Sequence, residues 1–177
     1  MNKENLRALA RKTHTAIAGL VGTSFFTISG GYLRDNLNSE ETSDIDCFFI
    51  DRKEYDKAVN GAINSGCIFI KERKNSQQFL TAGGKTIDLI FTYDGYVFDF
   101  DFTMNMISYD FGNDKLLLSD QVEEHIRDKV LVIKTNKLPM GLIERAKKFY
   151  DRDWRISRET KIKLMNNYLD GVDEATY

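Results

Sequence analysis

The sequence predicts an α+β fold, in which a small mixed or antiparallel sheet is flanked by helices and followed by a short C-terminal helical tail. Stretches whose apolar residues recur at helical spacing alternate with short runs of period-two strand pattern. Of the 177 residues, 42% are hydrophobic and 29% are charged, which suits a packed core and argues against wholesale disorder. The length fits one domain with an appended helical piece.

The N-terminal elements show the clearest pattern. Apolar residues at helical spacing predict an amphipathic helix over residues 3–21. Its basic residues precede an apolar run at 16–21, which loosely mimics a signal peptide, but the helical stripe gives the better account and predicts a cytoplasmic protein. The next elements are strands at 24–29 and 44–50, a short helix at 32–37, and a helix that begins with a capping-box-like Asp51–Glu54 and ends at Gly66.

The remaining elements are shorter. Strand patterns occur at 67–71, 78–81 and 86–91, with Gly83-Gly84 as a turn. We then expect a strand that ends near Asp99, a helix from about Phe102, and a short helix near 119–127 between segments at 116–118 and 130–134. Two further helices are expected, one around 142–150 and one that Ser157 caps and that extends to about residue 169.

A shift in charge marks the domain boundary. Residues 86–110 hold five aspartates and no lysine or arginine, whereas residues 145–163 hold eight basic residues against three acidic ones. We therefore divide the chain into a head, residues 1–136, and a helical tail, residues 137–177. The net charge of −2 disfavours a generally basic nucleic-acid binder, although a local basic patch suffices for an RNA substrate.

Cysteine and histidine usage excludes several classes of protein. Cys47 and Cys67 form no CxxC motif, which excludes a disulfide scaffold or a zinc finger, and both are predicted to be buried thiols in strands. His14 and His125 have no metal-ligand company and are predicted to be surface residues. No apolar run approaches the roughly 18 residues of a membrane span, so no membrane association is expected.

Carboxylates on strands are the first candidate for chemistry. Asp44 and Asp46 begin a strand, and the period of two turns both side chains to one face. Adjacent carboxylates repel each other unless a cation lies between them, and Mg²⁺ favours one or two carboxylates together with substrate phosphates. Asp88 lies within a later apolar strand, where burial is unfavourable unless it faces a polar site. The alternative for Asp44 and Asp46 is a solvated strand start.

A glycine turn and a later polar pair complete the candidates. Ser29-Gly30-Gly31 follows an apolar strand and opens a short helix, where the backbone can approach an anion closely, and Arg34 could add a cation for phosphate. The alternative is an ordinary turn, with Arg34 paired to Asp35 or a nearby carboxylate. Asp101 and Asn105 lie four residues apart, on one side of the expected helical start.

These motifs resemble the tRNA CCA-adding enzyme and bacterial poly(A) polymerase family, within the DNA polymerase β-like nucleotidyltransferases. The resemblance rests on GGYLRD at 30–35 followed by SDID at 43–46, and on DFTMNMISYD at 101–110, with Asp88 between them. It implies a nucleotidyltransferase head that binds Mg²⁺ or Mn²⁺ and a nucleoside triphosphate, ATP or CTP, and acts on an RNA acceptor in the cytoplasm.

The resemblance also implies a role for each residue. Asp44, Asp46 and Asp88 would be the catalytic, metal-binding carboxylates, and Asp88 would help activate the attacking hydroxyl. Ser29, Gly30, Gly31 and Arg34 would bind the triphosphate, while Asp101 and Asn105 would contact the nucleotide near its sugar. In the tail, RNA contacts are expected from Arg145, Lys148, Arg152 and Arg155, with Trp154 or Tyr150 as a stacking face; the alternative is a solvated helix face.

Two departures from the family pattern keep other functions open. The arginine pair expected before Asp101 is Asp99-Phe100, and the nucleotide-selecting motif expected near residues 138–142 is absent. The first hypothesis is nucleotidyl transfer to an RNA 3′ end. The second is transfer to a protein or a small molecule. The third is a catalytically degenerate head that binds a nucleotide or a partner.

Overall fold

The computed structural model describes residues 2–174 except 41, 43, 93–99 and 135–140. The chain forms two compact units. The first unit comprises residues 1–98 and 107–118, and the second comprises residues 99–106 and 119–177. The predicted division between residues 136 and 137 falls outside the described residues and stays a prediction. The predicted strand end near Asp99 also lies outside them.

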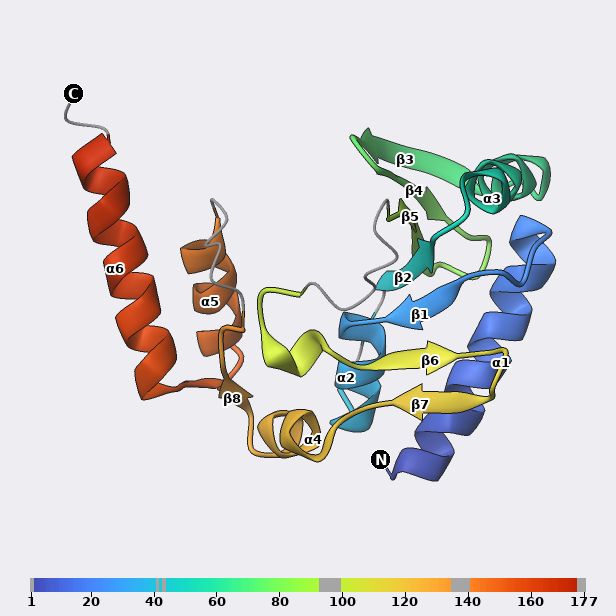
Figure 1. Cartoon of the computed structure of the whole chain (residues 1–177). Coiled ribbons are helices and arrows are strands. Elements are labelled where there is room, and N and C mark those ends of the chain that lie inside the picture. Colours follow the sequence, from blue (N-terminus) through green and yellow to red (C-terminus); the bar gives the residue numbers. More distant parts are fainter. Residues whose placement is uncertain (1, 41, 43, 93–99, 135–140, 175–177) are drawn as a thin grey trace. The chain divides into compact units, whose positions relative to one another are not determined.

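The first unit is built on a mixed sheet (Figure 1). Its strand order is β3-β4-β5-β2-β1-β6-β7, in which β2 and β5 are parallel and the other neighbours are antiparallel. The strands are β1 (Thr27–Ser29), β2 (Asp44–Phe49), β3 (Ile68–Arg73), β4 (Ser76–Leu80), β5 (Thr86–Phe91), β6 (Ser108–Asp110) and β7 (Lys115–Leu117). A mixed sheet with helices confirms the predicted α+β class.

Two helices cover one face of this sheet, α1 (Lys3–Val21) and α3 (Arg52–Asn64). The ring centroids of His14 on α1 and Tyr109 on β6 are 6.2 Å apart, and those of Tyr55 on α3 and Phe49 on β2 are 5.9 Å apart. An apolar row of residues in register runs across the same face and consists of Leu89, Cys47, Ile28 and Tyr109. Because side chains alternate along a strand, the next residues of each strand point to the opposite face.

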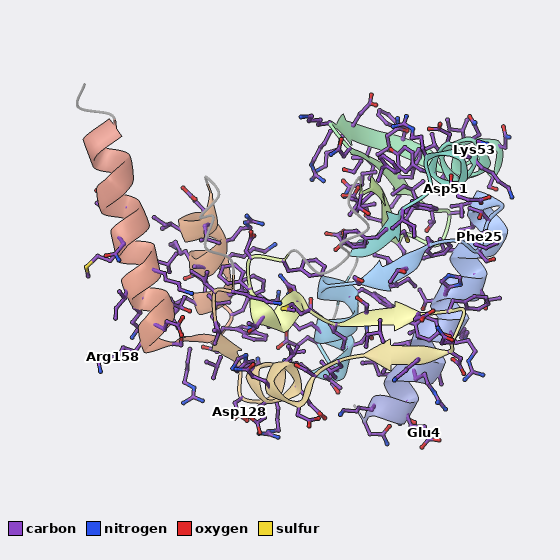
Figure 2. The ribbon with its side chains drawn as sticks, in the orientation of Figure 1. Glu4, Phe25, Asp51, Lys53, Asp128 and Arg158 are labelled. Atoms are coloured by element: carbon purple, nitrogen blue, oxygen red, sulfur yellow. The ribbon has the colours of Figure 1, made fainter. Side chains whose placement is uncertain are left out.

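The ends of α1 and α3 follow from their capping residues. Asn2 accepts a hydrogen bond from the Asn5 amide at 2.8 Å, and Gly22 ends α1 in the left-handed conformation. The Asp51 carboxylate, labelled in Figure 2, accepts hydrogen bonds from the amides of Lys53 and Glu54 at the start of α3. The predicted start of this helix is thereby confirmed.

His14 is the main correction within the first unit. It is fully buried rather than exposed, and it stacks between Phe26 and Phe111 with 4.1 Å between ring centroids on either side. Its Nε2 lies 3.1 Å from the carbonyl of Phe26, and burial lowers its pKa. The reason lies in the helical stripe, since His14 continues the buried series Leu6, Ala10, Ile17 and Val21.

The cysteines and the region after Asp101 give two smaller corrections. Cys47 is buried as predicted, but Cys67 precedes β3 and is only half-buried. No helix starts at Phe102, whose backbone is extended and bridges to Ile133. Only one turn of 3-10 helix, η1 (Thr103–Asn105), follows it, because the chain enters β6 at Ser108.

The second unit is mainly helical. Its elements besides η1 are α4 (Asp120–Arg127), β8 (Val130–Leu131), α5 (Leu142–Tyr150), β9 (Arg155–Ile156) and α6 (Arg158–Glu174). Phe102, Phe149 and Trp154 pack in edge-to-face contacts at its centre. Ser157 caps α6 through its hydroxyl, which accepts from the Thr160 amide at 3.1 Å, as predicted. None of the helices in the described residues combines the length and hydropathy needed to span a membrane.

Candidate active site

The face of the sheet opposite α1 and α3 carries a row of polar residues in register. Asp46 on β2 is the partner of Asp88 on β5 and of Ser29 on β1. Gln78 on β4 and Ser108 on β6 extend the row. Partners in register share a face, so five strands contribute polar side chains to one line, with the two carboxylates at its centre.

Asp44 lies two residues before Asp46, at the first position of β2. It is exposed, whereas Asp46 is half-buried and the intervening Ile45 is buried, as expected for side chains that alternate between faces. Among the described residues, no three histidine, cysteine, aspartate or glutamate side chains gather closely enough to hold a metal ion. The structure therefore brings Asp46 and Asp88 together as a pair, and the metal role of Asp44 stays a prediction.

The carboxyl group of Asp46 is in an unfavourable environment for ionisation. Its pKa is raised to about 6, first by burial and then by the negative charges of Asp88 and Asp44. Arg34 and Arg73 act in the opposite direction, but they do not offset the rise. The pair is thus short of positive charge.

Asp88 is the more deeply buried member, with 5% of its surface exposed. Its Oδ2 accepts from Nη1 of Arg73 at 2.8 Å, while its Oδ1 is buried and has no hydrogen-bond partner among the described residues. A buried carboxylate oxygen without a partner is costly unless a cation meets it. Oxygen donors in this number suit Mg²⁺, which needs one or two carboxylates and completes its shell with water and phosphate. The residues present therefore fit such an ion.

The glycine turn lies next to this pair. Ser29, the partner of Asp46, is fully buried and its hydroxyl hydrogen-bonds that of Ser108 at 2.5 Å. Gly30 follows with φ of 80° and ψ of −134°, a conformation that side chains disfavour, and its amide donates to the carbonyl of Ile107 at 2.9 Å. The Gly30 amide already donates to Ile107, so a phosphate at this turn would have to be bound by other backbone amides of the turn.

Arg34 takes the pairing role that the sequence left open as an alternative. It lies on α2 (Gly31–Leu37), only 4% exposed, and its Nη2 lies 2.6 Å from Oδ1 of Asp35, which is 6% exposed. The positive charge of Arg34 partly opposes the rise in the pKa of Asp46. Direct contact between Arg34 and a phosphate stays a prediction.

Asp101 and Asn105 belong to the second unit. Oδ2 of Asp101 lies 2.5 Å from Nη1 of Arg145 on α5, and Asn105 ends the η1 turn. The structure thus brings together two predicted residues, Asp101 and Arg145, that were assigned to different ligands. Their roles toward a nucleotide and toward RNA both stay predictions.

The basic tail residues are partly engaged within their own unit. The guanidinium of Arg152 lies 5.8 Å from the ring of Phe149, and Arg155 donates to the carbonyl of Asp128 at 3.3 Å. The expectation that Trp154 offers a stacking face is wrong, because its side chain is 1% exposed. Tyr150 is 63% exposed and keeps that role open. Lys148 is exposed on the same helix.

Arg73 is the residue at this site that reasoning from sequence missed. It lies in the basic run Lys71-Glu72-Arg73-Lys74, at the end of a strand whose hairpin partner, β4, pairs with β5. The available signal was this placement, since a hairpin next to Asp88 can bring a long side chain back over it.

Comparison with known proteins adds a family and a fold. The family model described as Gabija anti-defense 2 family protein matches residues 2–129. A curated protein named Gabija anti-defense 2, from Bacillus phage SPbetaL7, is 23% identical over 159 residues, which covers 81% of this chain and 37% of that protein. The chain therefore spans little more than a third of the length of this relative.

Solved structures share the fold at low identity. A CCA-adding enzyme with CTP aligns with a TM-score of 0.74 at 18% identity, over 99% of this chain and 48% of that one. The Thermotoga maritima CCA-adding enzyme complexed with tRNA gives a TM-score of 0.68 at 20% identity, over 97% and 43%. A tRNA nucleotidyltransferase with a primer tRNA and an ATP analogue gives 0.62 at 21%, over 90% and 51%. The expected nucleotidyltransferase fold is confirmed, whereas membership of the CCA-adding enzyme family stays a prediction.

Proposed function

We propose a function from the premise that the chain belongs to the Gabija anti-defense 2 family, whose model matches residues 2–129. The proposed activity is the transfer of a nucleoside monophosphate from a nucleoside triphosphate, ATP or CTP, to a hydroxyl group. It would depend on Mg²⁺ or Mn²⁺ and release pyrophosphate. The proposal concerns the activity of this chain alone, which covers 37% of the longer relative.

One observation carries this proposal. Asp46 and Asp88 are register partners on the face of the sheet opposite α1 and α3, the pKa of Asp46 is raised to about 6, and one oxygen of Asp88 is buried without a partner among the described residues. A purely structural pair of carboxylates has no need for such an arrangement. A pair of carboxylates beside a glycine turn, one of them with a raised pKa, is typical of a site for a cation and phosphates.

The residues of this chain would divide the work of the reaction. Asp46 and Asp88, with Asp44 beside them, would hold the metal ion, which when bound would polarise the attacking hydroxyl and neutralise the triphosphate. Asp88 would orient that hydroxyl and take its proton at a carboxylate oxygen. The oxygen of the acceptor hydroxyl would then bond to the α-phosphorus. The bond between the α-phosphorus and the oxygen that bridges to the β-phosphate would break, and pyrophosphate would leave. Gly30 and Gly31 would let the triphosphate approach the backbone, beside the positive charge of Arg34.

An RNA 3′ end is the first candidate acceptor. Two solved structures with this fold are complexes with tRNA. The second unit supplies Arg145, Lys148, Arg152 and Arg155 and the exposed ring of Tyr150 as candidate RNA contacts. Phosphate contacts from arginine and lysine together with one aromatic face are typical of single-stranded RNA binding.

A hydroxyl group on a component of the Gabija defence, a protein or a small molecule, is the second candidate acceptor. The family name denotes action against that defence. Several observations reduce the support for RNA: the net charge is −2, Trp154 is buried, and Arg145 is paired with Asp101.

The test uses labelled nucleotides. The protein is incubated with Mg²⁺, each α-labelled triphosphate in turn, and either total RNA or a lysate of cells that carry the Gabija defence, with Asp46→Ala as the control. Label in RNA that the variant loses would support the first acceptor, and label in a protein or a metabolite would support the second. No label in any fraction would contradict transfer. Nucleotide binding that persists in that case would support the third hypothesis, a catalytically degenerate head that binds a nucleotide or a partner.

A further inference from the structure

Arg73 reaches the carboxylate pair from the edge of the sheet. It ends β3, and its Nη1 lies 2.8 Å from Oδ2 of Asp88 on β5. Since β4 lies between these two strands, the side chain must pass over it. The residue of β4 in register with Arg73 is Ser76, whose small, buried side chain leaves room for the methylene groups of the Arg73 side chain. The hairpin thus delivers a cation to Asp88 across a whole strand.

The two partners in this ion pair differ in exposure. The side chain of Asp88 is 7% exposed, whereas that of Arg73 is 55% exposed. Every residue of β3 is exposed, and Arg73 is followed directly by the turn to β4. The carboxylate is therefore fixed within the sheet, while the guanidinium approaches from water and has room to withdraw.

Arg73 also acts on Asp46, whose ionisation it favours. It is thus a positive charge shared by both members of the pair, which is the role a divalent cation would have there. Oδ1 of Asp88 has no partner among the described residues, and Oδ2 is held by Arg73. A cation that bridges Asp46 and Asp88 would compete with the guanidinium for the same negative charge.

We propose that Arg73 is a built-in counter-ion, which neutralises the Asp46–Asp88 pair in the metal-free protein and leaves Asp88 when a divalent cation binds. The inference rests on the metal site of the proposed function. It makes Arg73 a positioning residue that stabilises the empty site and weakens its affinity for metal.

The test compares the binding of Mn²⁺ alone to the full chain and its variants by titration calorimetry. Arg73→Gln is expected to bind Mn²⁺ about tenfold more tightly than the wild type, because one competing charge is removed at contact distance. Lys71→Gln is the matched control. Lys71 is on the same strand, opposite Gln78, which neighbours Asp88, and has no ion pair with Asp88 among the described residues. The Lys71→Gln substitution removes the same charge and is expected to change the affinity for Mn²⁺ by less than about twofold.

Thermal unfolding in EDTA provides a second readout. Arg73→Gln is expected to melt below the wild type in EDTA and to gain more from Mn²⁺ than the wild type does. Equal or weaker Mn²⁺ binding by Arg73→Gln than by Lys71→Gln would overturn the counter-ion role and leave the metal site of the proposed function standing. Absence of Mn²⁺ binding in all three proteins would overturn both. If Arg73→Gln does not fold, Arg73→Lys replaces it. Lysine keeps the charge but loses the guanidinium contact with Asp88, so this variant is expected to bind Mn²⁺ more tightly than Lys71→Gln, and equal or weaker binding would overturn the counter-ion role.

Discussion

At the scale of single residues, Asp46 is where stability and proposed activity conflict. Its carboxyl group is crowded by Asp88 and Asp44 and by burial, which raises its pKa to about 6. A group arranged for folding alone would have its charge satisfied within the chain. The unfavourable ionisation is what makes the site ready for an external cation, and it should be measurable as lost stability.

The first prediction concerns the pH dependence of that loss. The unfolded carboxyl group has a pKa of about 3.9, so between about pH 4 and pH 6 the folded protein holds a proton that the unfolded chain has released. The contribution of Asp46 to the free energy of unfolding therefore falls as pH rises through this range and is constant above it. Asp46→Asn should remove that slope and be more stable than the wild type at pH 7 by about 1–3 kcal/mol in EDTA.

Urea titrations of both proteins at several pH values check this prediction. Asp44→Asn is the control, since Asp44 is exposed and should change the stability of the protein much less. A difference between Asp46→Asn and the wild type that stays constant from pH 4 to pH 7 would contradict the raised pKa.

The second prediction concerns His14, whose titration has the opposite effect on stability. Burial lowers its pKa, so the folded state stays neutral where the unfolded histidine, with a pKa near 6.5, takes up a proton. Its contribution to stability is lost as pH falls below about 6.5. His14→Phe keeps a ring between Phe26 and Phe111 and should therefore gain stability relative to the wild type from pH 7 to pH 5. Thermal melts at the two pH values measure this difference, and a constant difference would contradict it.

At the scale of elements, the packing of α3 against the end of α1 depends on one glycine. A Cβ atom at Gly61 would clash with the backbone carbonyl of Val21, and no side-chain adjustment relieves this clash because the contact is with backbone. The two helices approach closely here, on the face of the sheet opposite the carboxylates. This spacing in turn sets how α3 lies on β2 and β5, the strands that carry Asp46 and Asp88.

The third prediction follows from this contact. Gly61→Ala should destabilise the protein by about 2–4 kcal/mol, because the helices must move apart. Gly19→Ala on α1 is the matched control, since no described atom lies within 4 Å of its added Cβ and the substitution should stabilise the helix by about 0.5–1 kcal/mol. Urea unfolding of the two variants tests the pair, and equal effects would exclude the close contact as the cause.

The elements were largely predictable because they depend on local pattern. The helices at 3–21 and 52–64 have clear apolar stripes and caps, and Gly22 and Gly66 mark their ends. The carboxylates of Asp44 and Asp46 could be assigned to one face from strand period alone. What failed depended on tertiary packing. Phe102 is extended because it bridges to Ile133, and Trp154 is buried because it packs on Phe149.

The pairing of strands was beyond local pattern as well. The register between Asp46 and Asp88 joins segments 42 residues apart through a parallel pair, and no short-range signal sets it. Arg73 was missed for the same reason, because its contact with Asp88 requires the order β3-β4-β5. Residue types for the candidate site could therefore be proposed from the sequence, while the three-dimensional structure was needed to show which of them meet.

At the scale of the whole molecule, the chain consists of two compact units, each with its own buried residues. Cys47 is fully buried in the first unit, and Trp154, the only tryptophan of the sequence, is buried in the second. These two side chains report separately on the unfolding of their units. Units with separate cores need not unfold in one step.

The fourth prediction is that the two probes respond to different substitutions. Gly61→Ala in the first unit should lower the urea midpoint measured by pulsed thiol labelling of Cys47 and move the midpoint of Trp154 fluorescence by much less. Phe149→Leu, which loosens the ring contacts with Trp154 and Phe102, should do the reverse. Mass spectrometry separates the label on Cys47 from that on the half-buried Cys67. Equal shifts of both probes in both variants would instead mean that the units unfold as one cooperative body. The stability lost at Asp46 would then be lost by the whole chain rather than by the first unit alone.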